Sequence, residues 1–352
     1  MNNKFSDFLS SFGLMILGVL LLFIGSVKFT HAEPARPLTA VAGFKIVASA
    51  AVPTVQIADS IGGDSLPTVT PPRHPEIPLP VTNTPFNKDL SAAAVMVADD
   101  ATSAPLFEKN SGTSRPLASI TKLMSALVLQ SLPINWSSTT VITEDDVDSS
   151  SHHVNAGERF TLEDLWHVAL VGSSNSAINA LVAASGLTQE EFVAKMNSQA
   201  QEWRLRTLRF VEPTGLSSGN VGSAQDVSRL LGRALAVDKI YNTLQIGEYY
   251  AEPLGGKAKR RVWSTDWLLT NWVPSAFNKD SIVGKTGYTP ESGYNFAVRL
   301  SGEKQHAVRV VVLGTNSNTA RFSEARDLAE WALARYRWPG EAGYVDLAND
   351  SQ

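Results

Sequence analysis

The sequence contains no cysteine in its 352 residues. Disulfide bonds, thiolate metal sites and cysteine nucleophiles are therefore excluded. The chain also lacks an excess of basic residues, since its formal net charge is −4 and its pI is about 5.9. Because nucleic-acid-binding domains carry a basic surface, nucleic acid is not an expected partner. What remains, 43% hydrophobic and 18% charged residues, is typical of a protein with a packed core.

The first quarter of the chain has no tryptophan and much proline. All 8 Trp lie between Trp136 and Trp338, whereas 10 of the 18 Pro lie between Pro34 and Pro85. Proline at this density favours polyproline II and interrupts helices and central strands. We therefore expect a disordered, Pro-rich linker over 33–88, a folded domain over 89–340 and a short C-terminal tail over 341–352.

An uncharged apolar run occupies residues 8–27, between Lys4 and Lys28. Its length of about 20 residues is enough to cross a hydrocarbon core of about 30 Å. Thr30-His31-Ala32 then places small residues at the two positions that a signal peptidase recognises. Residues 1–32 are thus expected to be a signal peptide or an N-terminal membrane anchor, with the anchor favoured. Either would export the rest of the chain into the cell envelope.

The patterns in the folded domain predict an α/β protein. Strands are expected over 93–98 and 105–108 as a hairpin, and three consecutive antiparallel strands over 282–288, 294–300 and 306–314. Helical spacing is seen over 118–132, 162–170, 176–184 and 321–336. Strands at both ends with helices between them indicate one antiparallel sheet flanked by helices, with a mostly helical lobe inserted. A functional site is expected in the cleft between lobe and sheet.

Three short motifs occur in order within this domain. They are Ser119-Ile120-Thr121-Lys122, Ser173-Ser174-Asn175 and Lys285-Thr286-Gly287. Together they contain a hydroxyl nucleophile, an amine that can act as its base, a second hydroxyl and a cation, which are the groups of a serine acyl-transfer enzyme. Ser301-Lys304 and Ser218-Asn220 repeat the first two patterns by accident, so only the context distinguishes the sites.

The first motif pairs Ser119 with Lys122 on one helix face, at positions i and i+3. Serine is a weak nucleophile and needs a base. An ordinary lysine, with a pKa near 10.4, is neutral only about once in 10³ at pH 7. Lys122 must therefore have a lowered pKa, and both burial and the cation of Lys285 would lower it.

The other two motifs would position a substrate. Ser173 is expected in the break between two helices, where its hydroxyl could relay a proton, while the Asn175 amide holds a substrate peptide group. Lys285 and Thr286 suit a terminal carboxylate, and Gly287 allows a ligand backbone to approach the strand. The N–H groups of Tyr288 and Ser119 could form an oxyanion hole.

Two other kinds of site are disfavoured. A Ser-His-Asp triad lacks the G-x-S-x-G elbow, and the adjacent His152 and His153 have no third ligand for a metal. No metal and no cofactor are expected.

With these motifs, the chain resembles the low-molecular-mass penicillin-binding proteins, the D-alanyl-D-alanine carboxypeptidase family of serine peptidases. Besides the three motifs, the landmarks are Phe107-Glu108-Lys109-Asn110, Lys195-Met196-Asn197, Pro213-Thr214-Gly215-Leu216, Gly293-Tyr294-Asn295 and Arg321-Phe322. The resemblance covers about 93–338 and implies a β-lactamase/transpeptidase-like fold. It also implies that Ser119 is the acylated nucleophile, Lys122 its proton acceptor and Ser173 with Asn175 the second element.

The same resemblance implies a carboxylate site at Lys285 and Thr286, assisted by Arg321, and a peptidoglycan stem peptide ending in D-alanine as substrate. β-Lactams would acylate the same serine. A D,D-endopeptidase that cleaves crosslinks, a β-lactamase and a penicillin-binding sensor without turnover remain alternatives. The β-lactamase is disfavoured because no E-x-x-L-N segment lies between Asn175 and Lys285. The family often continues into a β-rich C-terminal domain and a membrane helix, which this sequence does not contain after Trp338.

Overall fold

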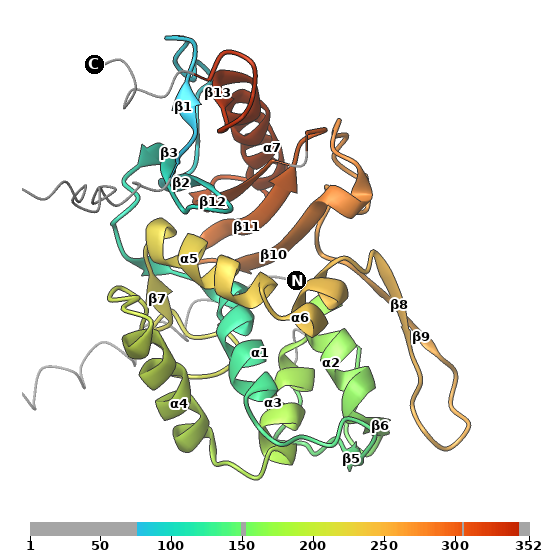
Figure 1. The fold of residues 1–352 in the computed structure, drawn as a ribbon. Helices are drawn as coiled ribbons and strands as arrows, with labels where there is room; N and C mark the ends of the chain where they lie inside the picture. Colours follow the sequence, from blue (N-terminus) through green and yellow to red (C-terminus); the bar gives the residue numbers. More distant parts are fainter. Residues whose placement is uncertain (1–75, 149–152, 305, 345–352) are drawn as a thin grey trace, which may run out of the picture. The chain divides into compact units, whose positions relative to one another are not determined.

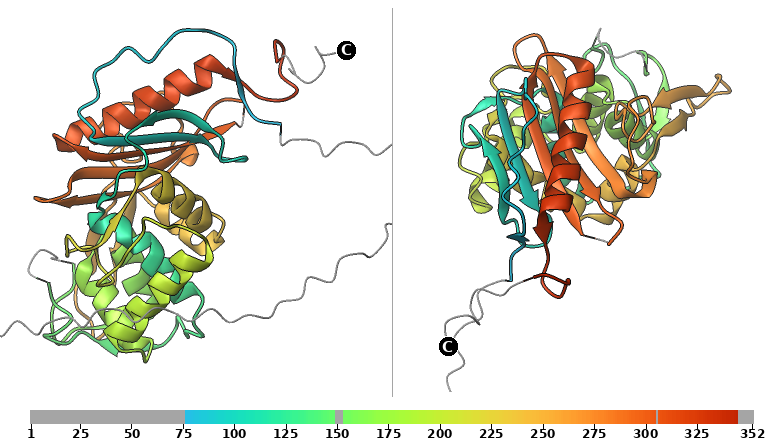
Figure 2. Two further views of the ribbon diagram at one scale, coloured as in Figure 1. Left: turned by 90° about the vertical axis from the view of Figure 1, so that its left-hand side faces the viewer. Right: turned by 90° about the horizontal axis from the view of Figure 1, so that it is seen from above.

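The computed structural model describes residues 76–148, 153–304 and 306–344. An antiparallel sheet has the order β10-β11-β12-β2-β3, and Figures 1 and 2 show it with α7 on one face and a group of helices on the other. Its strands are β2 (Ala94–Asp99), β3 (Pro105–Lys109), β10 (Ile282–Thr289), β11 (Gly293–Ser301) and β12 (Ala307–Thr315). The first and last parts of the domain therefore meet in one sheet, as predicted.

The sheet is covered on both faces, which explains its continuous apolar strands. All six residues of β2 are buried. Val95 and Val97 pack with α7 (Asn318–Arg335), whereas Ala94 and Met96 pack with the helices on the other face. Side chains alternate along a strand, so one short segment contributes to two hydrophobic cores.

The inserted lobe is mostly helical, as predicted. It contains η1 (Ala118–Thr121), α1 (Lys122–Gln130), α2 (Leu162–Val171), α3 (Asn175–Ala184), α4 (Gln189–Glu202), α5 (Ala224–Leu235) and α6 (Asp238–Leu244). Side-chain oxygens of Thr161, Ser174, Thr188 and Ser223 accept N–H groups at the starts of α2, α3, α4 and α5. These caps fix where each helix begins, and the start of α3 falls within the second motif.

Short elements complete the lobe and its connections to the sheet. They are the pairs β4 (Arg115–Pro116) with β7 (Val221–Gly222), β5 (Thr139–Val141) with β6 (Arg159–Thr161), and β8 (Glu248–Ala251) with β9 (Arg260–Trp263), together with η2 (Lys279–Ser281). None was predicted. All the strands in these pairs are only two to four residues long, too short for a periodic pattern to mark them.

The predicted linker and tail boundaries differ from the structure. Residues 76–88 lie against the domain, with β1 (Leu79–Pro80) paired to β13 (Tyr336–Arg337). The ring of Phe86 packs edge-to-face on Phe107 and Trp331, and Tyr344 donates to the carbonyl of Ile77. Proline is tolerated in β1 because this strand pairs along a single edge. The folded domain thus includes 76–88 and 341–344.

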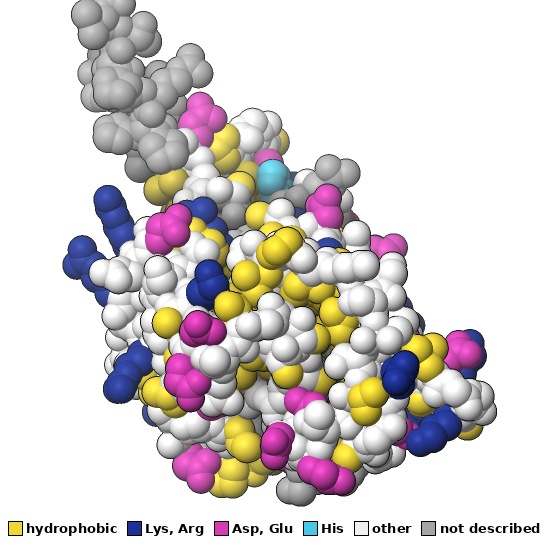
Figure 3. All heavy atoms as spheres, turned by 90° about the horizontal axis from the view of Figure 1, so that it is seen from below, with side chains coloured by type: hydrophobic (Ala, Val, Ile, Leu, Met, Phe, Trp, Pro, Cys, Tyr) yellow, Lys and Arg dark blue, Asp and Glu magenta, His cyan; other side chains and the backbone are white. Residues whose placement is uncertain are grey.

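The expected signal peptide or anchor over 1–32 and most of the linker lie outside the described residues. Within the part of the chain that is described, no helix combines the length and the apolar character required to cross a membrane. Figure 3 views the domain from below, where hydrophobic side chains gather near the centre of the face and charged side chains lie mostly around it.

Phe86→Ala should show that residues 76–88 belong to the fold. Loss of this partly buried ring from the cluster with Phe107 and Trp331 should lower the free energy of unfolding by about 2 kcal/mol. Urea denaturation would measure it, with the exposed Val81→Ala as the matched control. Equal stability of Phe86→Ala and the parent protein would contradict this assignment.

Candidate active site

Ser119 lies on a tight turn between the sheet and the lobe. A Cβ added to Gly287 of β10 would lie 2.7 Å from the Leu117 carbonyl oxygen and 3.1 Å from the Ser119 nitrogen. A Cβ on Gly215 would lie 2.0 Å from the Ala118 carbonyl oxygen. Ala118 itself has a φ of 49°, a strained value for a residue with a Cβ. Two glycines thus let two chain segments close on the turn and fix its position.

Lys122 reaches three acceptors from a fully buried position. Its Nζ donates to Ser119 Oγ at 3.0 Å, to Asn175 Oδ1 at 2.5 Å and to the Thr214 carbonyl oxygen at 2.7 Å. The orientation of the Asn175 amide follows from its other end, because Nδ2 donates to Asp148 Oδ2 at 2.6 Å. The amine therefore joins the turn, the start of α3 and the loop before α5.

Burial lowers the pKa of Lys122 to about 7, although the carboxylates of Glu212 and Asp148 act to raise it. Near neutral pH a large fraction of the amine is then uncharged. A neutral amine has two N–H donors and one lone pair. The Asn175 and Thr214 oxygens can only accept hydrogen bonds, so the lone pair must face the Ser119 hydroxyl, which is the geometry of a base beside its nucleophile.

Ser173 lies in the break between α2 and α3, as predicted. Its φ is 59°, a further strained backbone position, and its Oγ accepts from Lys285 Nζ at 2.7 Å. The second hydroxyl thus contacts the amine of the third motif and not that of the first. Lys285 therefore joins β10 to the lobe through Ser173, whereas Lys122 joins α1 to α3 within the lobe through Asn175.

The third motif lies on β10 opposite the lobe. Lys285 is buried, and burial, together with the charges of Lys122 and Arg321, holds its pKa well below the usual value. Thr286 Oγ1 is 2.6 Å from Thr265 Oγ1. The neighbouring Asp266 is a buried carboxyl whose pKa burial raises to about 6 against the charges of Arg321 and Lys285. The strand thus presents an amine and a hydroxyl in polar, mostly buried surroundings.

Tyr288 lies near the end of β10, and Arg321 of α7 packs behind this part of the strand. The Tyr288 side chain is half exposed and stacks on Tyr294 with ring centroids 4.3 Å apart. Arg321, on α7, is buried, and its Nη1 donates to the Gly287 carbonyl at 3.0 Å and more weakly to the Asn295 carbonyl at 3.4 Å. Arg321 therefore supports the backbone of β10 from the α7 side.

Glu212 is the main site residue that the sequence did not reveal. Its carboxylate accepts from the backbone N–H groups of Thr214, Gly215 and Ser217, from the Thr214 hydroxyl and from the Asn220 amide. These bonds fix the turn that carries the Thr214 carbonyl to Lys122. A lone glutamate before a P-T-G-L segment gives no periodic signal, so only the closed turn identifies its role.

Metal ligation has no support among the described residues, where no group of three or more His, Asp or Glu side chains has metal-binding geometry. His152 lies outside the described residues, so the pair of histidines is not tested.

The sheet, the lobe and a serine that faces a buried lysine define a serine acyl-transfer enzyme of the penicillin-binding class. The comparison with family models agrees, because the D-alanyl-D-alanine carboxypeptidase model matches residues 81–317. The chain therefore belongs to the D-alanyl-D-alanine carboxypeptidase family of serine peptidases.

Named relatives extend this result. The chain is 29% identical to a D-alanyl-D-alanine endopeptidase of Pseudomonas aeruginosa, over 72% of this chain and 81% of that protein. It is 30% identical to a D-alanyl-D-alanine endopeptidase of Haemophilus influenzae, over 62% of this chain and 74% of that protein. The crystal structure of a Streptomyces DD-transpeptidase has a TM-score of 0.64 at 21% identity and covers 71% of this chain and 99% of that one. This last likeness confirms the predicted fold.

Gly287→Ala should disable the site without unfolding the protein. The new methyl group would collide with the turn of Ser119, so the strand and the turn must separate and an oxyanion donor would be displaced. Loss of one such donor costs about 3 kcal/mol, so acylation by a fluorescent penicillin should slow by about 10² or more. The exposed Gly112→Ala, which has open space around its Cβ, is the control. Normal acylation by Gly287→Ala would refute the close approach.

The pH dependence of acylation should follow Lys122. Below a pKa of about 7 the amine is protonated and has no lone pair for Ser119, so the rate should rise with pH and level off above 7. Asp148→Asn removes a charge that raises the pKa of Lys122, and should move this rise to lower pH. The exposed Asp145→Asn should not. Stopped-flow acylation from pH 5 to 9 would reveal the shift, and identical profiles for all three proteins would argue against Lys122 as the base.

Proposed function

We propose that this protein is a serine-type D-alanyl-D-alanine carboxypeptidase that acts on peptidoglycan stem peptides through an acyl-enzyme at Ser119. The observation that carries the proposal is the contact of Lys122 Nζ with Ser119 Oγ, inside a buried group of acceptors that leaves the lone pair facing the serine. Membership of the family supports the substrate class.

The proposed reaction has two steps. Ser119 Oγ attacks the carbonyl carbon of the penultimate D-alanine while Lys122 accepts the hydroxyl proton, and the N–H groups of Ser119 and Tyr288 bind the oxyanion. The C–N bond then breaks, and Lys122 returns the proton to the leaving nitrogen, so that D-alanine leaves as the free amino acid. Ser173 would relay this proton after its hydroxyl turns from Lys285 toward Lys122. A water molecule then hydrolyses the ester and returns a proton to Ser119.

The substrate would lie along β10, between the strand and the start of α3. Lys285 and Thr286 would bind its terminal carboxylate, which a cation and a hydroxyl suit well. Asn175 would hold a substrate peptide group, and Gly287 leaves room for the peptide backbone. Arg321 would assist the carboxylate by adding positive charge behind the strand and by holding the Gly287 carbonyl.

β-Lactams should acylate Ser119, and the resulting acyl-enzyme should hydrolyse slowly. Rapid release requires a carboxylate that can activate water. Glu212, a carboxylate close enough to affect the pKa of Lys122, already accepts hydrogen bonds at both oxygens from the turn it closes. It is therefore poorly placed to act as a base, which favours a penicillin-binding peptidase over a β-lactamase.

A D,D-endopeptidase is the second candidate, because the relatives from Pseudomonas aeruginosa and Haemophilus influenzae carry that name. The same groups at Ser119 and Lys285 would serve both reactions, since both cleave next to D-alanine. In either case the substrate polymer places the protein in the cell envelope. An exported chain held there by residues 1–32 fits this location.

Purified full-length protein and Ser119→Ala should be incubated with a soluble pentapeptide muropeptide and, separately, with crosslinked dimers. Mass spectrometry should show loss of the terminal D-alanine with the parent protein and no loss with the variant. If the dimers are split and no D-alanine is released, the protein is an endopeptidase and the carboxypeptidase assignment is wrong. Unchanged substrates with stable penicillin labelling would indicate a sensor and contradict the proposal.

A further inference from the structure

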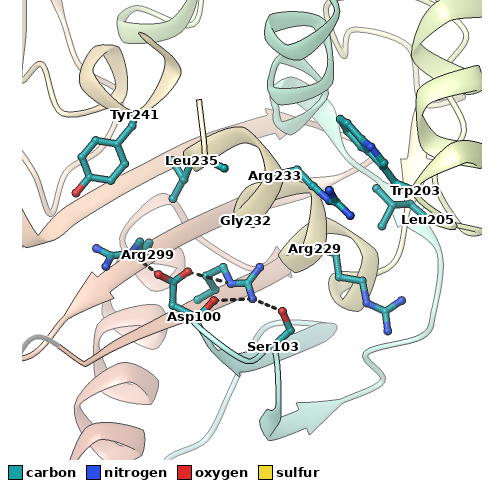
Figure 4. A pocket seen from close by; sticks show the side chains of 12 residues that line it. Asp100, Ser103, Trp203, Leu205, Arg229, Gly232, Arg233, Leu235, Tyr241 and Arg299 are labelled. Carbon is teal, nitrogen blue, oxygen red and sulfur yellow. Dashed lines mark hydrogen bonds and ion pairs between the residues drawn. The ribbon is translucent and has the colours of Figure 1, made fainter. Parts of the chain in front are cut away.

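A basic pocket lies away from the catalytic residues, between α5, the chain after α4 and the ends of β2, β11 and β12 near Asp100. Its volume is about 690 Å³, within the range of sites that bind small molecules. Figure 4 shows Arg229 and Arg233 on α5, Trp203 beside Arg233, and Asp100 with Arg299 at the sheet. None of its lining residues belongs to the serine site.

The charges that line the pocket are strongly unequal. Four arginines, Arg229, Arg233, Arg299 and Arg309, line it, and Asp100 is the one carboxylate among the lining residues. Asp100 is already shared, since Oδ2 accepts from Arg299 Nε at 2.6 Å and Oδ1 lies 3.2 Å from Arg309 Nε. When Asp226, which pairs with Arg229, and Asp99, whose charge acts on Arg309, are included, one positive charge remains uncompensated.

The four guanidinium groups have different surroundings. Arg309 is buried and donates to the Ser228 carbonyl and the Ser103 hydroxyl, so it holds α5 and the β2–β3 turn on the sheet. Arg233 is exposed, and it contacts the ring of Trp203 at 5.3 Å but no acidic side chain among the described residues. Arg229 is half exposed and one helical turn away from Arg233.

Like charges one turn apart on a helix disfavour the helix slightly. The C-terminal helix dipole favours Arg233, which lies in the last turn of α5. The three other guanidiniums have carboxylate partners, so Arg233 is the one that leaves its charge for a ligand. Guanidinium groups bind carboxylates through paired hydrogen bonds, and the neighbouring Trp203 and Tyr241 add ring surface for the body of a ligand. The pocket therefore offers the exposed Arg233 and the half-exposed Arg229 to a ligand that carries carboxylates.

We infer that this pocket is a second binding site for peptidoglycan and that it takes the carboxylate groups of stem peptides that are not being cleaved. The inference rests on the proposed function, which supplies a polymer with repeated carboxylates. Along β11, Arg299 is four residues, roughly 13 Å, from Asn295, whose amide contacts the Leu117 carbonyl beside Ser119. One polymer could thus reach both sites on the same molecule.

The test uses full-length protein, insoluble peptidoglycan freed of phosphate-bearing polymers, and the same material with its carboxylates converted to amides. Arg229→Gln/Arg233→Gln removes two pocket charges, and Arg206→Gln/Arg209→Gln removes two exposed charges that do not line the pocket. In cosedimentation, the pocket variant should bind the acidic polymer about tenfold more weakly than the parent protein, as expected for two exposed ion pairs. The control variant should bind like the parent.

Amidation should weaken binding of the parent protein by the same factor and have little effect on the pocket variant. Equal binding by parent and pocket variant, or equal binding of acidic and amidated polymer, would overturn the inference. So would binding that appears only with phosphate-bearing polymer. Release of D-alanine from a soluble pentapeptide is measured in parallel. The pocket variant should retain it, so a failure of the pocket and a failure of the proposed function give different results.

Discussion

The amine of Lys122 meets acceptors from three separate parts of the chain, and the rest of the site depends on that meeting. A pKa of about 7, instead of 10.5, corresponds to about 5 kcal/mol of lost preference for the charged form. Lysine in water has no such loss, so the packed lobe must compensate for it. Asn175 and the Thr214 carbonyl keep the amine hydrogen-bonded in both protonation states. The amine of Lys122 is therefore fixed in position whether or not it is charged.

The second constraint is the space around the serine turn. Gly215 and Gly287 have no side chain, so their segments can pack closely against the turn from two sides. Ala118 and Ser173 have strained φ angles of 49° and 59°. Strain of this kind costs about 1–3 kcal/mol per residue and persists only where neighbouring structure enforces it. Here the strained angles are enforced by the turn that Glu212 closes, by the cap of α3 at Ser174 and by the backbone contacts of Arg321. Glu212, Ser174 and Arg321 therefore contribute to the site by fixing the backbone positions of its reactive residues.

Most of this architecture was predictable from the sequence. The long apolar strands and helices have clear periods, and the sheet built from both ends of the domain followed from their order. Side-chain partners were harder to predict. The pKa of Lys122 was expected to be lowered by burial and by the cation of Lys285, but burial lowers it against two carboxylates and Lys285 is not among its causes. The hydroxyl of Ser173 contacts Lys285 and not Lys122. Glu212, Asp148 and Thr265 belong to loops or strand ends without a period. The boundary at 88 was expected because a high density of proline is typical of disorder, whereas Phe86 packs, partly buried, against the domain.

The sheet also imposes an order on folding. β2 pairs with β12, so Val95 lies opposite Val312 across most of the domain's sequence. Contacts with such large sequence separation close late and slow the folding reaction. During synthesis the β2–β3 hairpin must wait, with one edge unpaired, until the last third of the chain has emerged. An unpaired edge can recruit strands from other molecules, so the nascent protein should depend on chaperones that shield this edge until β12 arrives.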